Sequence, residues 1–156
     1  MNKKEFVRQA EIIKKQLYKT AYLYLGNEAN ALDVVDETIY KGYKALWQLR
    51  EEEYFTTWMT RILINECKKE LKRLSRIKCQ ESLVTKQSED YDYDQLPLKE
   101  AIRSLPTQLK DVVILRYFSG YTLAEAAKAL NIPQGTVVTR QRKALKLLKL
   151  ELGEEE

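Results

Sequence analysis

Histidine is absent from the 156-residue chain, and cysteine occurs only at Cys67 and Cys79. A zinc site with four Cys or His ligands is therefore excluded within one chain, as is acid–base catalysis by histidine. Two cysteines do not make a disulfide framework, and Cys67 falls on the apolar side of a predicted helix, where a small buried residue is expected. A glycine-rich phosphate loop and paired carboxylates are missing as well. The sequence thus predicts no metal, no cofactor and no enzymatic activity.

Long apolar runs are also missing. Hydrophobic residues make up 44% of the chain, which is enough for a core of modest size, but no run of 18 apolar residues is present that would span a membrane. The first residues, MNKKEFVRQAEIIKKQ, mix charged and apolar side chains, unlike a secretory signal peptide. We therefore expect a protein of the cytoplasm with no membrane insertion of its own.

Positive charge is gathered in two separated patches, although the net charge is only +4. Residues 61–80 contain seven basic and two acidic side chains, and residues 133–150 contain five basic side chains and no acidic one. Between these patches, residues 81–95 contain five acidic side chains and one basic, in a segment rich in Ser, Gln and Asp. This distribution indicates two basic domains joined by an acidic linker.

The N-terminal part predicts three helices. Apolar residues at three-to-four spacing predict one over residues 3–25, ended by Gly26-Asn27, and a second that Asn30 caps. After a loop at residues 50–53, a third helix is expected from Thr56 or Thr57 to about Arg76. At about 100° per residue this helix separates into two faces. The cationic face comprises Arg61, Asn65, Lys68, Lys72 and Arg76. The opposite face is apolar and comprises Met59, Leu63, Cys67, Leu71 and Leu74.

Aromatic side chains lie beside the cationic face in the sequence. They are Tyr54, Phe55 and Trp58 at the start of the third helix, and Tyr40, Tyr43 and Trp47 on the helix before it. Aromatic rings beside a basic groove are suited to stacking unpaired bases while the cations hold the backbone. The alternative is that these rings are core, which we favour for Tyr43 and Trp58 and leave open for Tyr54 and Phe55.

The C-terminal part predicts a helix over residues 98–105, a second opened by Pro106 and Thr107, and then a helix-turn-helix. The second is expected to pack through Leu109, Val112, Val113, Leu115 and Tyr117. Thr122 and Glu125 form a capping box that starts the next helix at Leu123, and Asn131 ends it. Pro133 suits the first turn of the last helix. One face of that helix carries Val137, Ala144, Leu145 and Leu148, and another carries Thr136, Thr139, Arg140 and Lys143.

Two helices, a tight turn and a polar, cationic face near the start of the second are what a helix-turn-helix needs to enter a major groove. The alternative is a solvated basic helix packed on its neighbour. Because the cap, the turn and the face agree, we favour nucleic-acid binding. The chain is thus predicted to be all-α, with a three-helix domain over residues 1–76, a flexible acidic linker over residues 77–97 and a helix-turn-helix domain over residues 98–156.

Two stretches resemble group 4, or extracytoplasmic-function (ECF), sigma factors of bacterial RNA polymerase. DVVDETIYKGYKALWQL and FTTWMTRILINECKKELKR are similar to the family's region 2, and LPTQLKDVVILRYFSGYTLAEAAKALNIPQGTVVTRQRKAL is similar to region 4. The resemblance implies an all-α subunit that binds core RNA polymerase, on the clamp helices of the largest subunit and the flap of the second-largest. It also implies recognition of promoter DNA, transcription of a stress-related regulon and control by an anti-sigma factor, often membrane-bound.

The resemblance further assigns roles to residues. Reading of the minus-thirty-five element falls to Gln134, Gly135, Thr136, Thr139, Arg140 and Lys143. Capture of the minus-ten element falls to Tyr54, Phe55, Arg61, Asn65, Lys68 and Lys72. Docking on the clamp helices falls to Asp33, Asp36, Glu37 and Tyr40. Val138 stands where the family often has a basic residue and Asp36 where Gln is frequent, so the minus-thirty-five preference and the polymerase contact are expected to depart from the family pattern.

A different interpretation is a stand-alone helix-turn-helix regulator that binds an operator and uses its N-terminal domain to sense or to dimerise. This interpretation explains residues 121–150 equally well. It leaves the cationic face of residues 61–76 and the neighbouring aromatic rings without a role.

Overall fold

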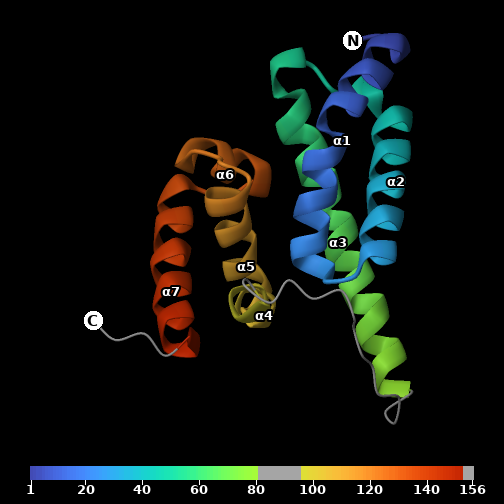
Figure 1. Ribbon diagram of the computed structural model, residues 1–156. Coiled ribbons are helices and arrows are strands. Elements are labelled where there is room, and N and C mark those ends of the chain that lie inside the picture. Colours follow the sequence, from blue (N-terminus) through green and yellow to red (C-terminus); the bar gives the residue numbers. More distant parts are fainter. Residues whose placement is uncertain (81–95, 153–156) are drawn as a thin grey trace. The chain divides into compact units, whose positions relative to one another are not determined.

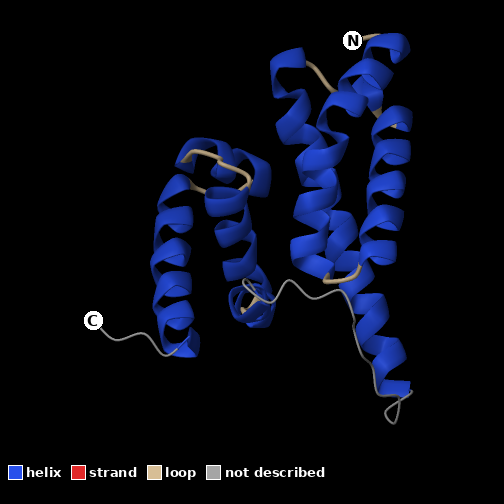
Figure 2. Cartoon of the chain, in the orientation of Figure 1, coloured by secondary structure: helices blue, strands red, loops and turns tan. Residues whose placement is uncertain are grey.

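The computed structural model describes residues 1–80 and 96–152, which are almost entirely helical and contain no strand (Figures 1 and 2). The prediction of an all-α chain is confirmed. The chain divides into two compact units, one N-terminal and one C-terminal. In the described part of the chain, no helix is long and apolar enough to cross a membrane.

Three helices that all contact one another form the N-terminal unit (Figure 1): α1 (Lys3–Leu25), α2 (Glu28–Lys44) and α3 (Phe55–Gln80). The core between them is made of large side chains that are almost fully buried, among them Phe6, Leu17, Tyr24, Val35, Met59 and Leu63. α1 has the predicted bounds, and it ends where Gly26 adopts a left-handed conformation with φ 68°.

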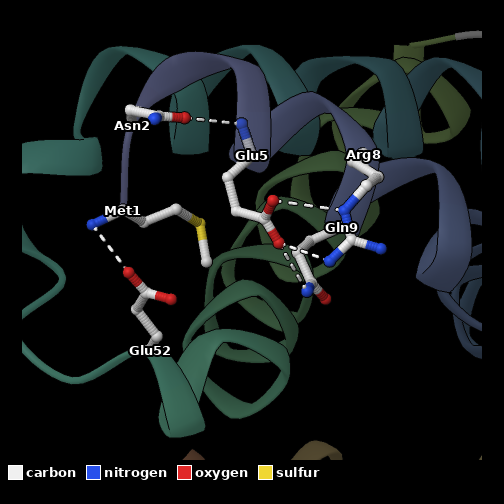
Figure 3. Close-up of polar contacts among 6 residues, drawn as sticks. All are labelled: Met1, Asn2, Glu5, Arg8, Gln9 and Glu52. Atoms are coloured by element: carbon white, nitrogen blue, oxygen red, sulfur yellow. Dashed lines mark hydrogen bonds and ion pairs between the residues drawn. The ribbon is translucent and has the colours of Figure 1, made fainter.

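Polar contacts hold the first turn of α1 (Figure 3). The Asn2 side chain accepts a hydrogen bond from the backbone N–H of Glu5 at 2.7 Å, which caps the helix. The Glu5 carboxylate in turn accepts hydrogen bonds from Arg8 and Gln9, and these bonds, that of Arg8 above all, lower the pKa of Glu5 to about 2. The amino group of Met1 lies 3.1 Å from the carboxylate of Glu52, so the start of α1 contacts the segment between α2 and α3.

The start of α2 differs from the prediction. Asn27, not Asn30, is the N-cap, and its side chain accepts a hydrogen bond from the backbone N–H of Asn30 at 2.9 Å. Both residues are good caps, but Asn27 follows the left-handed Gly26 directly and is already extended, with φ −144°. The helix therefore begins at Glu28, three residues earlier than expected.

The segment between α2 and α3 contains two short 3₁₀ turns, η1 (Leu46–Gln48) and η2 (Glu52–Tyr54). The second turn leads directly into α3, which begins at Phe55 rather than at Thr56 or Thr57. α3 ends at Gln80, four residues beyond the predicted end at Arg76. Residues 77–80 of the predicted linker are therefore helical, and residues 81–95 lie outside the described residues.

The C-terminal unit contains α4 (Leu96–Ser104), α5 (Thr107–Val113), the π-helical turn η3 (Ile114–Phe118), α6 (Leu123–Leu130) and α7 (Gln134–Leu152). α7 packs against α4, α5 and α6. In η3, the backbone N–H of Ser119 donates to the carbonyl of Ile114 at 2.9 Å. This wider turn shifts the register of the side chains, so Ile114 and Leu115 are fully buried, whereas Tyr117, predicted to pack in the core, is 49% exposed.

The helix-turn-helix forms as predicted at its first helix. The Thr122 hydroxyl accepts a hydrogen bond from the backbone N–H of Glu125 at 3.1 Å, and the Glu125 carboxylate accepts one from the backbone N–H of Thr122 at 2.9 Å. Asn131 ends α6 in the left-handed conformation, with φ 58°. Pro133 lies just before α7, rather than within its first turn, and its carbonyl accepts from Thr136 and Val137.

Candidate nucleic-acid interface

Near its start, α7 has a polar face on one side, and its opposite side packs in the core of the C-terminal unit. Val137, Ala144 and Leu148 are buried in the C-terminal unit, whereas Leu145, predicted to share that face, is 39% exposed. Leu145 lies at the edge of the buried stripe, about 100° from Ala144. The six residues assigned to the minus-thirty-five element occupy the first three turns of α7, Gln134, Gly135, Thr139 and Lys143 being exposed and Thr136 and Arg140 half-buried.

The hydroxyl of Thr139 donates a hydrogen bond to the carbonyl of Gly135 at 3.1 Å, within α7. Its proton is therefore committed to the helix, while its oxygen lone pairs and its methyl group are left at the exposed surface. Thr139 is thus equipped to accept a hydrogen bond or to contact a thymine methyl group, and not to donate.

Arg116 joins three segments of the C-terminal unit. Its Nε donates to Oε1 of Gln141 on α7 at 2.8 Å, and its second guanidinium nitrogen donates to the carbonyl of Tyr121, just before α6, at 2.7 Å. Helical periodicity in the sequence does not predict this contact. The one available signal was a single charged residue in the apolar run VVILRYF, but its partner Gln141 lies 25 residues away.

α3 carries the predicted cationic face. Arg61, Asn65, Lys72 and Arg76 are exposed and Lys68 is half-buried. On the opposite side Met59, Leu63 and Cys67 are fully buried, as predicted, while Leu71 and Leu74 toward the end of the helix are half-buried. The core thus fixes the orientation of α3, and the cationic face is directed away from it.

The aromatic rings around the start of α3 have different environments. Phe55 is only 2% exposed, and its ring centroid lies 5.6 Å from that of Phe6 and 6.5 Å from that of Trp58. Because α3 begins at Phe55, this ring turns into the bundle and is unavailable to stack a base, which corrects the assignment of Phe55 to the minus-ten set. The neighbouring Tyr54, in η2, is 37% exposed. Tyr43 is half-buried and packs edge-on against Phe6.

The outer face of α2 is acidic and partly apolar. Asp33, Asp36 and Glu37 are exposed and Tyr40 is 55% exposed, and the four lie within about 100° of one another around the helix. On the other side of α2, Val34, Val35 and Thr38 are buried. The four residues assigned to polymerase docking therefore share one accessible surface.

An ion pair joins α2 to α3 beside this surface. Nζ of Lys41 lies 2.6 Å from the Glu66 carboxylate, whose side chain is only 10% exposed, and the hydrogen bond raises the pKa of Lys41. Glu66 also lies 3.8 Å from Lys69. This contact, which sequence periodicity does not reveal, fixes α2 and α3 relative to each other.

Comparison with known proteins agrees with both units. Residues 11–77 match the family described as sigma-70 region 2, and residues 101–150 match sigma-70 region 4. RNA polymerase sigma factor SigV of Bacillus subtilis is 31% identical, over 92% of this chain and 88% of that protein. ECF RNA polymerase sigma factor SigW of the same organism is 26% identical, over 94% and 88% of the two chains.

A solved structure shares the fold. The sigma factor RpoE from Bartonella quintana, crystallised with the anti-sigma factor NepR, aligns with a TM-score of 0.81 over 98% of this chain and 99% of that one, at 21% sequence identity. Two helical units, one ending in a capped helix-turn-helix, define a promoter-recognition protein of the region 2 and region 4 type. The chain belongs to the sigma-70 family, as one of its ECF RNA polymerase sigma factors. The interpretation as a stand-alone operator-binding regulator is not favoured, because the matches extend over both units.

Proposed function

We propose that this sigma factor binds core RNA polymerase and directs it to promoters in the cytoplasm by binding alone, without catalysis. α7 reads the minus-thirty-five element, and α3 with the segment before it captures the opened minus-ten element. The observation that supports this most directly is that each folded unit carries one exposed cationic face backed by a buried core, on α3 and on α7. The face on α3 holds the backbone of single-stranded DNA, and the face on α7 belongs to a helix that is suited to the major groove.

Duplex recognition is assigned to the residues at the start of α7: Gln134, Gly135, Thr136, Thr139, Arg140 and Lys143. Arg140 and Lys143 supply positive charge for phosphates or guanine, and Gln134 supplies an amide for adenine. The half-buried Val138 lies on the same turn without a charge, so this chain makes one phosphate or base contact fewer than relatives with a basic residue there.

Capture of the opened strand is assigned to Tyr54, Arg61, Asn65, Lys68 and Lys72. Extruding a base from the duplex costs a few kcal/mol, and stacking on an aromatic ring returns about 1–3 kcal/mol per base. The exposed ring of Tyr54 precedes α3 directly, so a base stacked on it leaves the following backbone near the cationic face.

Docking on polymerase is assigned to Asp33, Asp36, Glu37 and Tyr40 on α2, which meet the clamp helices of the largest subunit, while the C-terminal unit meets the flap of the second-largest. An accessible acidic face suits a basic partner surface. The Bartonella quintana relative was crystallised with an anti-sigma factor. We propose that an anti-sigma factor, membrane-bound in some species, controls this chain as well, and that its regulon responds to stress.

Run-off transcription with purified core bacterial RNA polymerase on a library of random upstream sequences tests the proposal. Transcripts that require the chain and share two spaced motifs are expected, and they would define its promoter. The matched control is the Arg140→Ala variant. Transcripts made with it should share the downstream motif, while their upstream motif should be degenerate. If no transcript depends on the chain, while the chain alone still selects a duplex motif, the proposal is wrong and operator binding becomes the better explanation.

A further inference from the structure

The solvent-facing side of α1 carries positive charge that the residue roles proposed above do not use. Four exposed basic side chains form this surface, which we call the α1 ridge: Lys4, Arg8, Lys15 and Lys19. At about 100° per residue, they lie within about 60° of one another around the helix. The buried side chains of Phe6 and Leu17 lie on the opposite side of α1. The core therefore directs the α1 ridge straight outward.

Most of the charge on the α1 ridge is not neutralised within the protein. Lys4, Lys15 and Lys19 make no hydrogen bond or ion pair with the residues that the structure describes. Arg8 is bonded to Glu5 (Figure 3). The exposed Glu11 borders the ridge on the side of α2, where it lines a groove between the two helices. The ridge thus keeps a net positive charge, which suits an anionic partner.

Apolar and aromatic side chains accompany these cations. Ile12 lies about 20° from Lys19 around the helix, and it is 63% exposed. Toward the end of α1, the half-buried rings of Tyr18 and Tyr22 have centroids 6.1 Å apart. An isolated aliphatic side chain contributes little to a contact with nucleic-acid phosphates. At a lipid surface it enters the boundary of the acyl chains, and tyrosine is enriched at that depth. This combination favours a membrane over nucleic acid.

The α1 ridge also has a suitable shape. α1 is one α-helix from Lys3 to Leu25. At about 1.5 Å per residue, Lys4 and Lys19 lie about 22 Å apart along its axis. A straight row of cations on the outside of a bundle reaches several headgroups of a flat surface at once. Clusters of about four to eight basic residues on an amphipathic helix are typical of binding to anionic lipids.

We propose that the α1 ridge binds the surface of an anionic phospholipid membrane, with its lysines on the headgroups and Ile12 at the acyl boundary. The contact is peripheral and reversible, and salt weakens it. The inference goes beyond the proposed function, because the ridge shares no residue with the docking surface of α2 or with the cationic faces of α3 and α7. A membrane-bound share of the chain lowers the amount that is available to bind polymerase.

The test measures co-sedimentation of the purified full chain with vesicles of phosphatidylcholine, with and without an equal part of phosphatidylglycerol. Binding is expected only to the anionic vesicles and should decrease as salt is raised. Lys15→Ala combined with Lys19→Ala should weaken it about 30-fold, since each lysine near an anionic surface contributes about 1 kcal/mol. Ile12→Ser should weaken it about tenfold, as expected when roughly two methylene groups leave the acyl boundary, and Ile12→Leu should preserve it.

The matched control is Lys72→Ala combined with Arg76→Ala, because it removes the same charge from an exposed face of α3. This pair should leave vesicle binding unchanged. The inference is overturned if the chain does not bind anionic vesicles, or if the control pair weakens binding as much as the Lys15 and Lys19 changes do. It is also overturned if Ile12→Ser has no effect.

Nucleic acid is the other polyanion that the α1 ridge could contact, and the same variants separate the two partners. Affinity for a DNA duplex of random sequence and for single-stranded RNA should not change with Lys15→Ala and Lys19→Ala. An equal loss of affinity for vesicles and for nucleic acid would overturn the assignment to lipid. Run-off transcription should be normal with this pair, so a failure of the membrane inference leaves the proposed function intact, and the reverse also holds.

Discussion

The hydroxyl of Thr38 is buried in α2, and no hydrogen-bond partner for it lies within the described residues. A buried polar group without a partner costs about 1–3 kcal/mol, and a methyl group of the same shape avoids this cost. Thr38→Val should therefore raise the free energy of unfolding by about 1 kcal/mol, measured by urea denaturation. The matched control is Thr60→Val, because Thr60 is also buried but has a polar interaction, so that change should destabilise the protein. Equal effects at both positions would contradict the explanation.

Gly42 on α2 has no room for a side chain. A Cβ on Gly42 would lie 2.6 Å from Sδ of Met59 and 3.3 Å from the ring of Phe6, both of which are buried. Overpacking costs about 1–3 kcal/mol, whereas Gly→Ala in a helix gains about 1 kcal/mol. Gly42→Ala should therefore lower the free energy of unfolding by about 1 kcal/mol in the same urea experiment.

Gly135 is the matched control for this change, since it also lies in a helix but a Cβ there would meet nothing within 4 Å. Gly135→Ala should stabilise the chain by up to about 1 kcal/mol. If Gly42→Ala stabilises as much as Gly135→Ala, Met59 moves aside freely and the close packing is not a constraint.

Glu5 gives α1 a pH dependence with a definite sign. Its pKa is lowered from 4.5 to about 2 by hydrogen bonds from Arg8 and Gln9. A lowered pKa in the folded state means that the contribution of Glu5 to stability is present above pH 4.5 and is lost as the pH falls toward 2. The carboxyl carbon of Glu5 followed by NMR should titrate with a midpoint near 2, and Arg8→Ala should move that midpoint back toward 4.5. A midpoint that Arg8→Ala leaves unchanged would contradict the stated cause.

At the scale of the element, the position of α7 depends on the bond between Arg116 and Gln141. Gln141→Leu leaves Nε of the half-buried Arg116 without its acceptor and should destabilise the C-terminal unit by about 1–2 kcal/mol in urea. It should also weaken binding to minus-thirty-five duplex. Gln141 lies at least about 100° around α7 from the polar face of Thr136, Thr139, Arg140 and Lys143, and affects that face through the angle of the helix.

Gln141→Glu keeps the acceptor and should restore both stability and duplex affinity, since a hydrogen bond between charged groups is stronger. If the bond between Arg116 and residue 141 only stabilised the fold, Gln141→Glu would restore stability without restoring duplex affinity. Recovery of stability alone would therefore show that the bond does not position the recognition surface.

Elements that depend on local signals were predictable from the sequence. α1 and the capping box of α6 match because their caps, Gly26 and Thr122, act within a few residues. The start of α2 was missed because Asn27 and Asn30 are equally good caps by chemistry. Phe55 and Tyr54 are adjacent aromatic residues, and only the first residue of α3 decides which ring enters the core. Contacts between distant residues, such as Arg116 with Gln141 and Lys41 with Glu66, leave no periodic signal in the sequence.

At the scale of the whole molecule, the two units act through their connection in one chain. Once either candidate DNA surface is bound, the other binds its element as an intramolecular step, at an effective concentration in the millimolar range for a short connection. Each surface alone therefore needs only modest affinity, and a gain of about 10²–10⁴ comes without any further contact. Loss of one surface should then weaken promoter use without abolishing contacts made by the other.

This separation is testable with two variants and a charge control on four DNA molecules. Arg140→Ala should reduce transcription about tenfold from a promoter with both elements, because one charged contact to duplex DNA is lost, and should have no effect on a template without the upstream element.

Lys68→Ala combined with Lys72→Ala should impair opening of both duplex templates. On a pre-opened template it should reduce the slope of log affinity against log salt by about 1.4. Affinity for the isolated upstream duplex should not change in this double variant, and the Lys15→Ala, Lys19→Ala pair controls for net charge. If instead the Lys68 and Lys72 changes weaken upstream duplex binding as much as Arg140→Ala does, both units contact the same DNA segment and the division of labour proposed for α3 and α7 is wrong.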